Sequence, residues 1–344
     1  MSRRFREEEW EEVEPVHPTV QASDQVVEAM LHLDRHPDTL MRWPYPDLDT
    51  LTGPMGEGEV WFLCAFSGGG KTTFVCSCIE AWRRTGRRVY VMPLELQPFR
   101  FRTYLACMAV GVHPGDALSG TLRADPARAA ERAVLKQALV DQAKEPYVER
   151  IMVSEQRRIN VRGLETGLKE AKAFHADIVI VDHIDHIAGG NGTNLYAESC
   201  AVNDAALQMA QDNGMLLLFT SQLNMEIVKG DKLAKYQPPM PHHVMFPTAK
   251  LKNATGMLGL FRPVRSRTPG ETDADYADTI KRARQGLSEP HHALEPSVMG
   301  VHAMKLRNYG QHEGRRVSLG FENGKVVHLP EKDRHSGIYG GTMV

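Results

Sequence analysis

Short apolar runs alternate with amphipathic segments along most of this chain. Five runs have the length and composition of buried strands, and they lie at residues 59–66, 87–95, 150–155, 177–184 and 215–224. Apolar residues recur at helical spacing in the segments between them, at residues 71–84, 97–145, 160–175 and 195–213. Because apolar strands that alternate with helices are buried on both faces, the pattern predicts an α/β fold with a doubly wound, mostly parallel sheet.

The pattern changes toward the C-terminus. Residues 256–264 form one more apolar run, and the polar segment 268–297 follows it without any assigned function. Two further predicted strands, 298–307 and 315–326, are joined by only a short polar connection. A connection that short suits an antiparallel pair, so we expect a C-terminal antiparallel extension of the sheet.

The N-terminal region differs from the rest in composition. Residues 1–22 are acidic and poor in aliphatic side chains, which predicts a mobile tail. In the segment 23–45, Ser23 and Asp24 can cap a short helix, and the prolines after that helix prevent it from continuing. This linker helix packs either on its own domain or, as we expect, on a neighbouring subunit. The main domain is predicted at 46–330, with a flexible tail at 331–344.

Composition and charge exclude several classes of protein. The 344 residues carry a net charge of −2, so the whole chain is not a polycation that coats nucleic acid. No apolar run approaches the roughly 18 residues that span a bilayer. The five cysteines are odd in number and mostly lie in apolar runs, which favours reduced thiols and a cytoplasmic protein over a disulfide scaffold.

A glycine-rich segment lies between the first predicted strand and the helix that follows it. This is the context of a phosphate-binding P-loop, in which backbone N–H groups and the helix N-terminus surround phosphate oxygens. Lys71 is predicted to reach the β- and γ-phosphates, and the hydroxyl of Thr72 to bind Mg²⁺. Ala65 replaces the usual first glycine. The predicted nucleotide-binding residues are Ser67, Gly68, Gly69, Gly70, Lys71, Thr72 and Thr73.

Polar side chains stand at the ends of three other predicted strands. Asp182 ends an apolar run and is expected to hold Mg²⁺ beside the P-loop. Glu95 ends the second strand and can activate the attacking water, unless it is a solvated loop residue. Gln222 can contact the γ-phosphate, with a purely structural amide as the alternative. Asp185 is interpreted as a cap or loop residue. His183 and His186, which lack other ligands at zinc spacing, are interpreted as surface or loop side chains.

These motifs, in this order, resemble the RecA-like C-terminal ATPase core of DnaB-type replicative hexameric helicases. The family commonly has alanine at the position of Ala65. Its glutamate after the second strand matches Glu95, and its Ser-Gln-Leu-Asn stretch is present as Ser221–Asn224. Its Lys-x-Arg-Asn signature matches Lys305–Asn308. The resemblance covers about residues 45–330, and because only about 45 residues precede the core, we expect this chain to lack the N-terminal primase-binding domain of the family.

The resemblance implies an ATP-dependent ring, with ATP and Mg²⁺ as cofactors, that moves on single-stranded DNA. Arg307 is then an arginine finger on the γ-phosphate of the neighbouring subunit, with Lys305 beside it. The expected partners are further copies of this chain in a hexamer, a helicase loader and other replication proteins, in a bacterial cell or a phage-infected host. The resemblance does not exclude two alternatives, a RecA-like recombinase filament and a signalling or defence ATPase that engages a protein.

DNA contacts are predicted in two loops, at about residues 188–196 and 225–255, whose counterparts line the central channel of the family. Residues 225–267 contain eight Lys or Arg and two acidic residues, a local charge of +6. A basic segment of this kind suits sequence-independent backbone binding, although a solvated charged surface is the usual alternative. The predicted DNA-binding residues are Lys250 and Lys252, then Lys229, Lys232 and Lys235, and Asn191 in the other loop.

Overall fold

The computed structural model describes most of the chain between Leu40 and Leu329. The described residues are 26–27, 30, 40–157, 159–187, 195–224, 226, 238–245, 247–262, 272–275, 277–278, 281, 298–322 and 325–329. The chain divides into two units, 1–40 and 41–344. In the first unit residues 26–27 and 30 are helical, and the predicted tails 1–22 and 331–344 lie outside the described residues. The fold below is that of the second unit.

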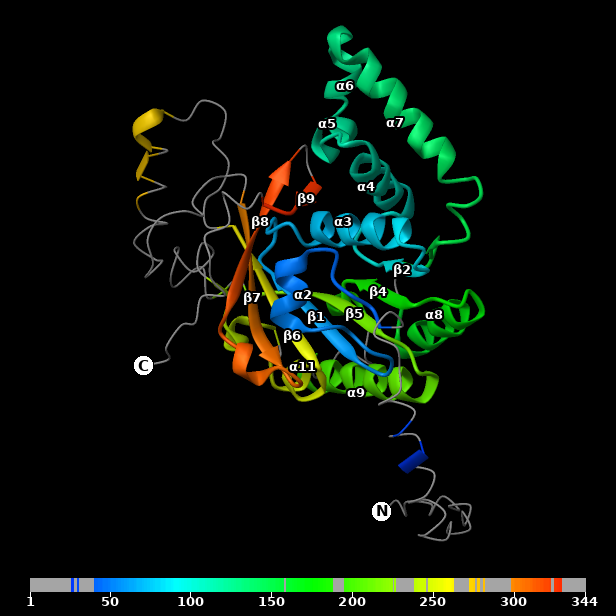
Figure 1. The fold of residues 1–344 in the computed structure, drawn as a ribbon, viewed down its shortest axis with the longest axis vertical. Coiled ribbons are helices and arrows are strands. Elements are labelled where there is room, and N and C mark those ends of the chain that lie inside the picture. Colours follow the sequence, from blue (N-terminus) through cyan, green and yellow to red (C-terminus); the bar gives the residue numbers. More distant parts are fainter. Residues whose placement is uncertain are drawn as a thin grey trace, which may run out of the picture. The chain divides into compact units, whose positions relative to one another are not determined.

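A nine-stranded sheet forms the centre of the second unit (Figure 1), with the order β3-β2-β4-β5-β1-β6-β7-β8-β9. The strands are β1 (Val60–Ala65), β2 (Val89–Pro93), β3 (Ile151–Val153), β4 (Ile178–Asp182), β5 (Leu217–Gln222), β6 (Gly256–Phe261), β7 (Val298–Leu306), β8 (Arg316–Glu322) and β9 (Lys325–Val327). In this spatial order, adjacent strands from β3 across to β6 are parallel to each other. Adjacent strands from β6 across to β9 are antiparallel. The predicted fold class is therefore confirmed.

Most helices lie where helical spacing predicts them, but α2 (Pro46–Thr52) and α11 (Pro247–Asn253) fall in segments predicted as a linker and a loop. The bounds of the others are α3 (Lys71–Arg84), α4 (Pro98–Val110), α5 (Pro114–Ser119), α6 (Thr121–Ala124), α7 (Ala129–Asp141), α8 (Val161–Ala173) and α9 (Leu195–Asn213). Short 3₁₀ turns are η2 (Pro126–Arg128), η3 (Ile184–His186), η5 (Pro241–His243) and η6 (Gly310–His312). No helix among the described residues is long and apolar enough to cross a membrane.

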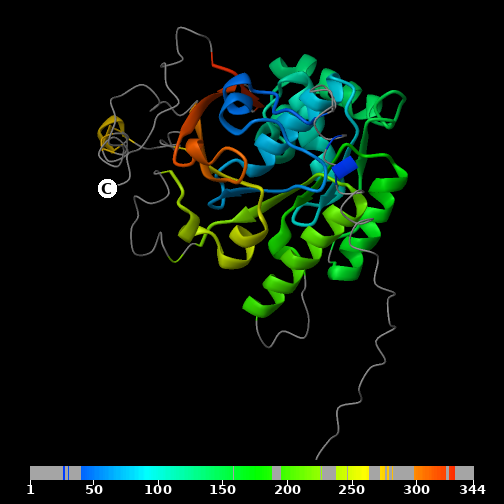
Figure 2. The ribbon, with the colours of Figure 1, turned by 60° about the horizontal axis from the view of Figure 1, so that its bottom comes forward.

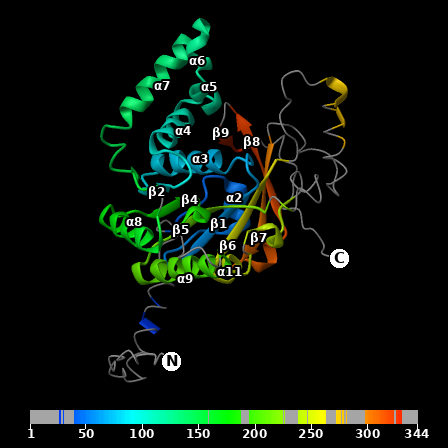
Figure 3. The same cartoon turned by 180° about the vertical axis from the view of Figure 1, so that it is seen from behind.

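Two layers of helices cover the sheet, one on each face. Figures 1 and 3 show α3 and α4 on one side and α8 and α9 on the other, and Figure 2 turns the face covered by α9 toward the reader. Alternate residues of β1 enter different cores: Trp61 and Leu63 pack with α3, whereas Val60 and Phe62 pack with α8 and α9. This two-sided burial explains why the strands read as continuous apolar runs rather than alternating ones.

The C-terminal extension contains one strand more than the sequence predicts. The segment 315–326, predicted as a single strand, contains the two antiparallel strands β8 and β9. The dipeptide Asn323-Gly324 between them favours a two-residue hairpin turn. The prediction was wrong because apolar residues continue on both sides of this dipeptide.

Candidate functional site

The P-loop lies at the carboxyl end of β1 and ends at the first residue of α3. Gly68 and Gly70 have φ values of 74° and 90°, a left-handed backbone that favours glycine. A Cβ on Gly69 would lie 2.9 Å from both the carbonyl oxygen of Phe66 and the Cβ of Ala65. The three glycines therefore leave the backbone of this tight turn uncovered by side chains. The turn accommodates the methyl group of Ala65, but it leaves no space for a side chain at position 69.

Lys71 is the buried cation of this loop. Only 7% of the residue is exposed, and Nζ donates to the carbonyl oxygen of Ala65 over 3.2 Å. Burial lowers the pKa of Lys71, while the carboxylates of Asp182 and Glu95 oppose that shift. The ammonium group thus lies inside the turn, among carboxylates that approach it from β4 and from the end of β2.

The structure brings the two predicted Mg²⁺ ligands together. Thr72 Oγ1 donates to Asp182 Oδ2 over 3.2 Å, although 110 residues separate the two in sequence. Thr220 of β5 donates to the other carboxylate oxygen over 2.5 Å. Asp182 is fully buried, and burial raises its pKa, whereas the hydrogen bond from Thr220 opposes the shift. A hydroxyl and a carboxylate at this spacing are the oxygen donors that Mg²⁺ uses in P-loop proteins.

Glu95 and Gln222 lie at the same edge of the sheet as Asp182. The backbone N–H of Glu95 donates to the carbonyl oxygen of Asp182 over 3.0 Å, and its side chain remains 43% exposed. Gln222 ends β5, and its Nε2 lies 3.3 Å from Nε2 of His183. His183 Nε2 also lies 3.5 Å from Glu95 Oε2. One imidazole therefore contacts both the predicted base and the predicted γ-phosphate sensor.

His183 was interpreted from the sequence as a surface or loop side chain, and it lies in the turn between β4 and η3 but is buried. It is 3% exposed, its Nδ1 lies 3.2 Å from Asp185 Oδ2, and its ring packs against His186 with centroids 4.2 Å apart. The sequence did not predict this burial, because spacing along the chain does not show that β2 and β5 flank β4. That strand order places Glu95 and Gln222 on either side of the residue that follows Asp182.

Asp185, interpreted from sequence as a cap or loop residue, is instead the centre of a buried polar cluster. Its carboxylate accepts hydrogen bonds from the Gln222 backbone over 2.9 Å, from Ser221 Oγ over 3.1 Å and from Lys250 Nζ over 2.5 Å. Burial alone would raise the pKa of Asp185, but the hydrogen bond to His183 and the charge of Lys250 outweigh it, so its pKa lies well below the usual range. The cluster fixes the end of β5.

The position of Lys250 in the structure disagrees with the prediction that this residue is the preferred DNA contact. Its side chain is fully buried, and Nζ also donates to Ser221 Oγ over 2.7 Å. An ammonium group that is held by a buried carboxylate and hydroxyl is not presented to a phosphate backbone. Lys252, two residues later on α11, is exposed. The other predicted DNA contacts, Lys229, Lys232, Lys235 and Asn191, lie outside the described residues.

Lys305 and Arg307 lie apart from the P-loop. Lys305 Nζ donates to the carbonyl oxygen of Leu251, and the exposed Arg307 donates through Nη2 to the carbonyl oxygen of Lys252 over 3.1 Å. Within the part of the chain that the structure describes, neither side chain contacts Lys71 or Asp182. Because β7 runs antiparallel to β6, its carboxyl end meets the amino end of the parallel strands, at the edge opposite the P-loop.

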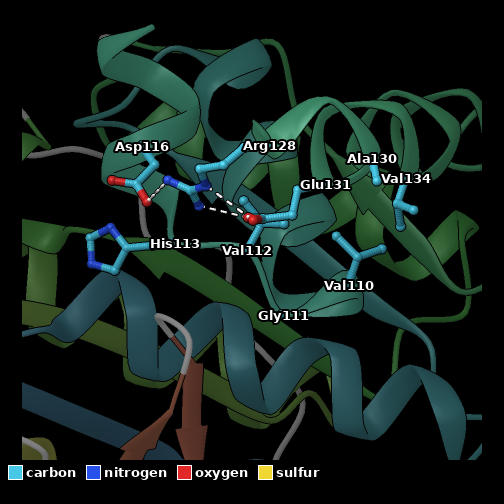
Figure 4. A pocket seen from close by; sticks show the side chains of 9 residues that line it. All are labelled: Val110, Gly111, Val112, His113, Asp116, Arg128, Ala130, Glu131 and Val134. Carbon is cyan, nitrogen blue, oxygen red and sulfur yellow. Dashed lines mark hydrogen bonds and ion pairs between the residues drawn. The ribbon is translucent and has the colours of Figure 1, made fainter. Parts of the chain in front are cut away.

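A separate cavity of about 670 Å³ lies between α4, α5 and α7. Figure 4 shows Arg128 between Asp116 and Glu131, with N–O distances of 2.7 and 2.6 Å. Val110, Val112 and Val134 add apolar side chains to the lining, which includes none of the predicted nucleotide-binding residues. This cavity is therefore distinct from the site at the sheet edge.

Comparison with known proteins identifies a family and several solved structures that are similar to this chain. A family model described as DnaB-like helicase C terminal domain matches residues 41–238. No curated protein sequence matches the chain. Among solved structures, one described as an ATPase domain matches with a TM-score of 0.67 and 17% identity, over 92% of this chain and 100% of that one.

Two further solved structures are similar. The first is a DnaB-like replicative helicase, described with its interactions with primase, which matches with a TM-score of 0.65 and 17% identity over 90% of this chain and 66% of that one. The second is the RadB recombinase, with a TM-score of 0.46 and 14% identity over 82% of this chain and 96% of that one.

Proposed function

Because this chain belongs to the family of DnaB-like helicase C-terminal domains, and is therefore an ATP-hydrolysing enzyme of the helicase type, we propose that it forms a ring that moves along single-stranded DNA. ATP is hydrolysed between neighbouring subunits of this ring. The observation that carries the proposal is the separation of the hydrolytic residues into two groups at opposite edges of one sheet. One subunit alone does not bring them together.

The first group binds the triphosphate. The backbone N–H groups around Gly68–Gly70 and the ammonium of Lys71 hold the β- and γ-phosphates at the N-terminus of α3. The oxygens of Thr72 and Asp182, already 3.2 Å apart, fit a bound Mg²⁺. Such an ion, when bound, neutralises the phosphate charge. Glu95 lies at the open side of this group and accepts the proton of the attacking water. Gln222 contacts the γ-phosphate through its amide.

The second group is supplied by the neighbouring subunit. The Arg307 backbone N–H bonds to the carbonyl oxygen of Thr255, and the Thr255 N–H bonds to that of Val60, so Arg307 lies level with the first residue of β1, with β6 between β7 and β1. The P-loop follows Ala65, five residues further along this strand, which corresponds to about 16 Å at 3.3 Å per residue. An arginine side chain does not span that distance. We therefore assign Arg307 to the active site of the adjacent subunit, with Lys305 beside it.

Assembly also uses the N-terminal linker helix in this proposal. Its described apolar residues Val26, Val27 and Met30 are 55–58% exposed, and such side chains become buried when the helix docks on a neighbouring subunit. We propose a hexamer, as in the helicases that the motifs resemble. The basic segment after β5 then faces the central channel, where Lys252 contacts the DNA backbone in place of the buried Lys250.

One experiment tests the whole proposal. We expect the purified protein with Mg²⁺ and ATP to hydrolyse ATP faster when single-stranded DNA is added, and to form closed rings in negative-stain images. Lys71→Ala protein is the control that should lose hydrolysis. ATPase activity that ignores DNA would contradict translocation, and open helical filaments would favour a recombinase instead.

A further inference from the structure

Two histidines and a carboxylate converge beside the nucleotide site, and the proposed function uses neither imidazole. One ligand atom from each of Glu95, His183 and His186 lies within 4.8 Å of the other two. The separation of His183 Nε2 from Glu95 Oε2 is 3.5 Å. Ligands that bind one tetrahedral ion at about 2.0–2.1 Å stand about 3.4 Å apart. This pair therefore already has the required separation.

The second observation concerns the orientation of His183. This side chain is buried: Nδ1 lies 3.2 Å from the carboxylate of Asp185 but outside hydrogen-bond geometry, and Nε2 faces Glu95 and the amide of Gln222. A carboxylate partner on one ring nitrogen keeps the proton there, which leaves the lone pair on the other nitrogen for a metal. Asp185 is itself fixed by Lys250. The supporting carboxylate of a metal-binding histidine is thus already in place.

The type of ligand determines which metal suits the site. Mg²⁺ prefers oxygen ligands and dehydrates reluctantly, so two imidazoles disfavour it. Two histidines and one glutamate are a ligand set of zinc enzymes in which a fourth position stays open. Glu95 and His186 are exposed, so their side chains can rotate to complete the coordination while water occupies the open position. We propose that Glu95, His183 and His186 form a binding site for Zn²⁺ or a similar divalent transition ion.

The site has a consequence for hydrolysis that rests on the proposed function. A carboxylate that coordinates a metal no longer has a free lone pair in the right place to accept a proton from water. Zn²⁺ bound to Glu95 therefore removes the general base and stops turnover, even with Mg²⁺ and ATP in excess. Binding requires neutral imidazoles, and any proton on them is released to solvent. The metal acts as a reversible inhibitor, and the P-loop is unchanged.

The test measures binding and inhibition separately. Zn²⁺ is titrated calorimetrically into nucleotide-free protein in millimolar Mg²⁺, and Co²⁺ replaces it for absorption spectra. We expect one strong Zn²⁺ site and the visible bands of tetrahedral Co²⁺. The His186→Ala variant should bind roughly 100-fold more weakly or worse, because it loses one of three protein ligands. His242→Ala, which removes a histidine on η5, should bind as the unmodified protein does.

Zn²⁺ inhibition of steady-state ATPase is then compared with the uninhibited rate of the same protein. We expect micromolar Zn²⁺ to inhibit the unmodified protein and His242→Ala, and His186→Ala to need roughly 100-fold more Zn²⁺. Absence of a strong site, or equal binding by His186→Ala, overturns the metal site and leaves the proposed function intact. Strong binding without inhibition keeps the metal site but contradicts the role of Glu95 as the base.

Discussion

The two halves of the sheet differ in what their ends carry. In the parallel half, the carboxyl ends of β1, β2, β4 and β5 meet at one edge and place Lys71, Glu95, Asp182 and Gln222 within one region. In the antiparallel half, β7 runs the other way and its carboxyl end places Arg307 at the opposite edge. Strand direction alone therefore divides the chemistry between two surfaces.

The halves also differ in how they treat buried charge. In the parallel half, the buried Asp182 and Lys250 and the half-buried Asp185 lie within a network of hydrogen bonds and opposite charges. In the antiparallel half, desolvation lowers the pKa of the buried His302 to about 4, because the charge of Arg316 adds to the shift and a backbone hydrogen bond at Arg315 opposes it only in part. The first half thus pairs its buried charges with one another, whereas burial in the second half disfavours the charged form of His302.

The largest expected effect concerns the residue at the opposite edge. Arg307→Ala should lower ATP turnover by about 10³-fold or more, the usual scale for a lost arginine finger. A mixture of Arg307→Ala and Lys71→Ala proteins, each inactive alone, should recover activity, because some interfaces then combine an intact P-loop with an intact Arg307. Steady-state ATPase over a range of mixing ratios checks this.

Two controls accompany the mixing experiment. Co-purification of two different tags shows that mixed assemblies form, and Arg123→Ala, an exposed arginine on α6, should retain turnover. If demonstrably mixed assemblies stay inactive at every ratio, Arg307 does not act on the neighbouring subunit.

The next effect concerns the buried pair of the parallel half. Lys250→Met should lower the free energy of unfolding by about 3 kcal/mol or more, because it leaves the Asp185 carboxylate buried without its cation. Combining it with Asp185→Asn should recover much of the loss. Urea unfolding of both variants provides the measurement, with Lys252→Met on the exposed side of α11 expected within about 0.5 kcal/mol of the unmodified protein. A Lys250→Met protein of normal stability would show that the ion pair contributes nothing.

A smaller effect is expected at the general base. Glu95→Gln should keep ATP binding and assembly but reduce turnover by about 10²-fold, because an amide does not accept the proton of water. Fluorescent nucleotide binding and steady-state hydrolysis separate the two quantities. Glu165→Gln, an exposed residue of α8, serves as the matched control. Near-normal turnover of the Glu95 variant would remove this residue from the role.

The smallest expected effect is on the pH dependence of stability, and it concerns a buried histidine in the antiparallel half. His302 has a pKa of about 4 in the folded protein, below the usual 6.5, because it is desolvated and faces Arg316. The unfolded chain therefore binds more protons between these values, and stability falls as the pH falls. Between pH 7 and pH 5 this group contributes a loss of about 2 kcal/mol. Urea unfolding of His302→Gln should show a pH dependence that is smaller by this amount, and an identical dependence would contradict the assignment.

Much of the nucleotide site was predictable because its signals are local. A glycine turn between a strand and a helix specifies its own backbone, and an apolar run that ends in Asp182 places a carboxylate at a strand end. The contact of Thr72 with Asp182 then follows from the parallel sheet. The prediction for Lys250 was wrong for the opposite reason. A lysine in a basic segment is usually solvated. Lys250 is buried because the fold places its ammonium group against Asp185 and Ser221, which are far from it in sequence.

The sequence by itself determined how strands and helices alternate along the chain, where the P-loop lies and to which family the chain belongs. These features depend on periodicity and short motifs, which are properties of neighbouring residues. The tertiary structure decided which distant groups meet. The insertion of β4 between β2 and β5 brought His183 against Glu95 and Gln222, and the reversal of β7 carried Arg307 away from its own P-loop. The order of strands within the sheet is set by packing over the whole sheet, so no local stretch of sequence specifies it.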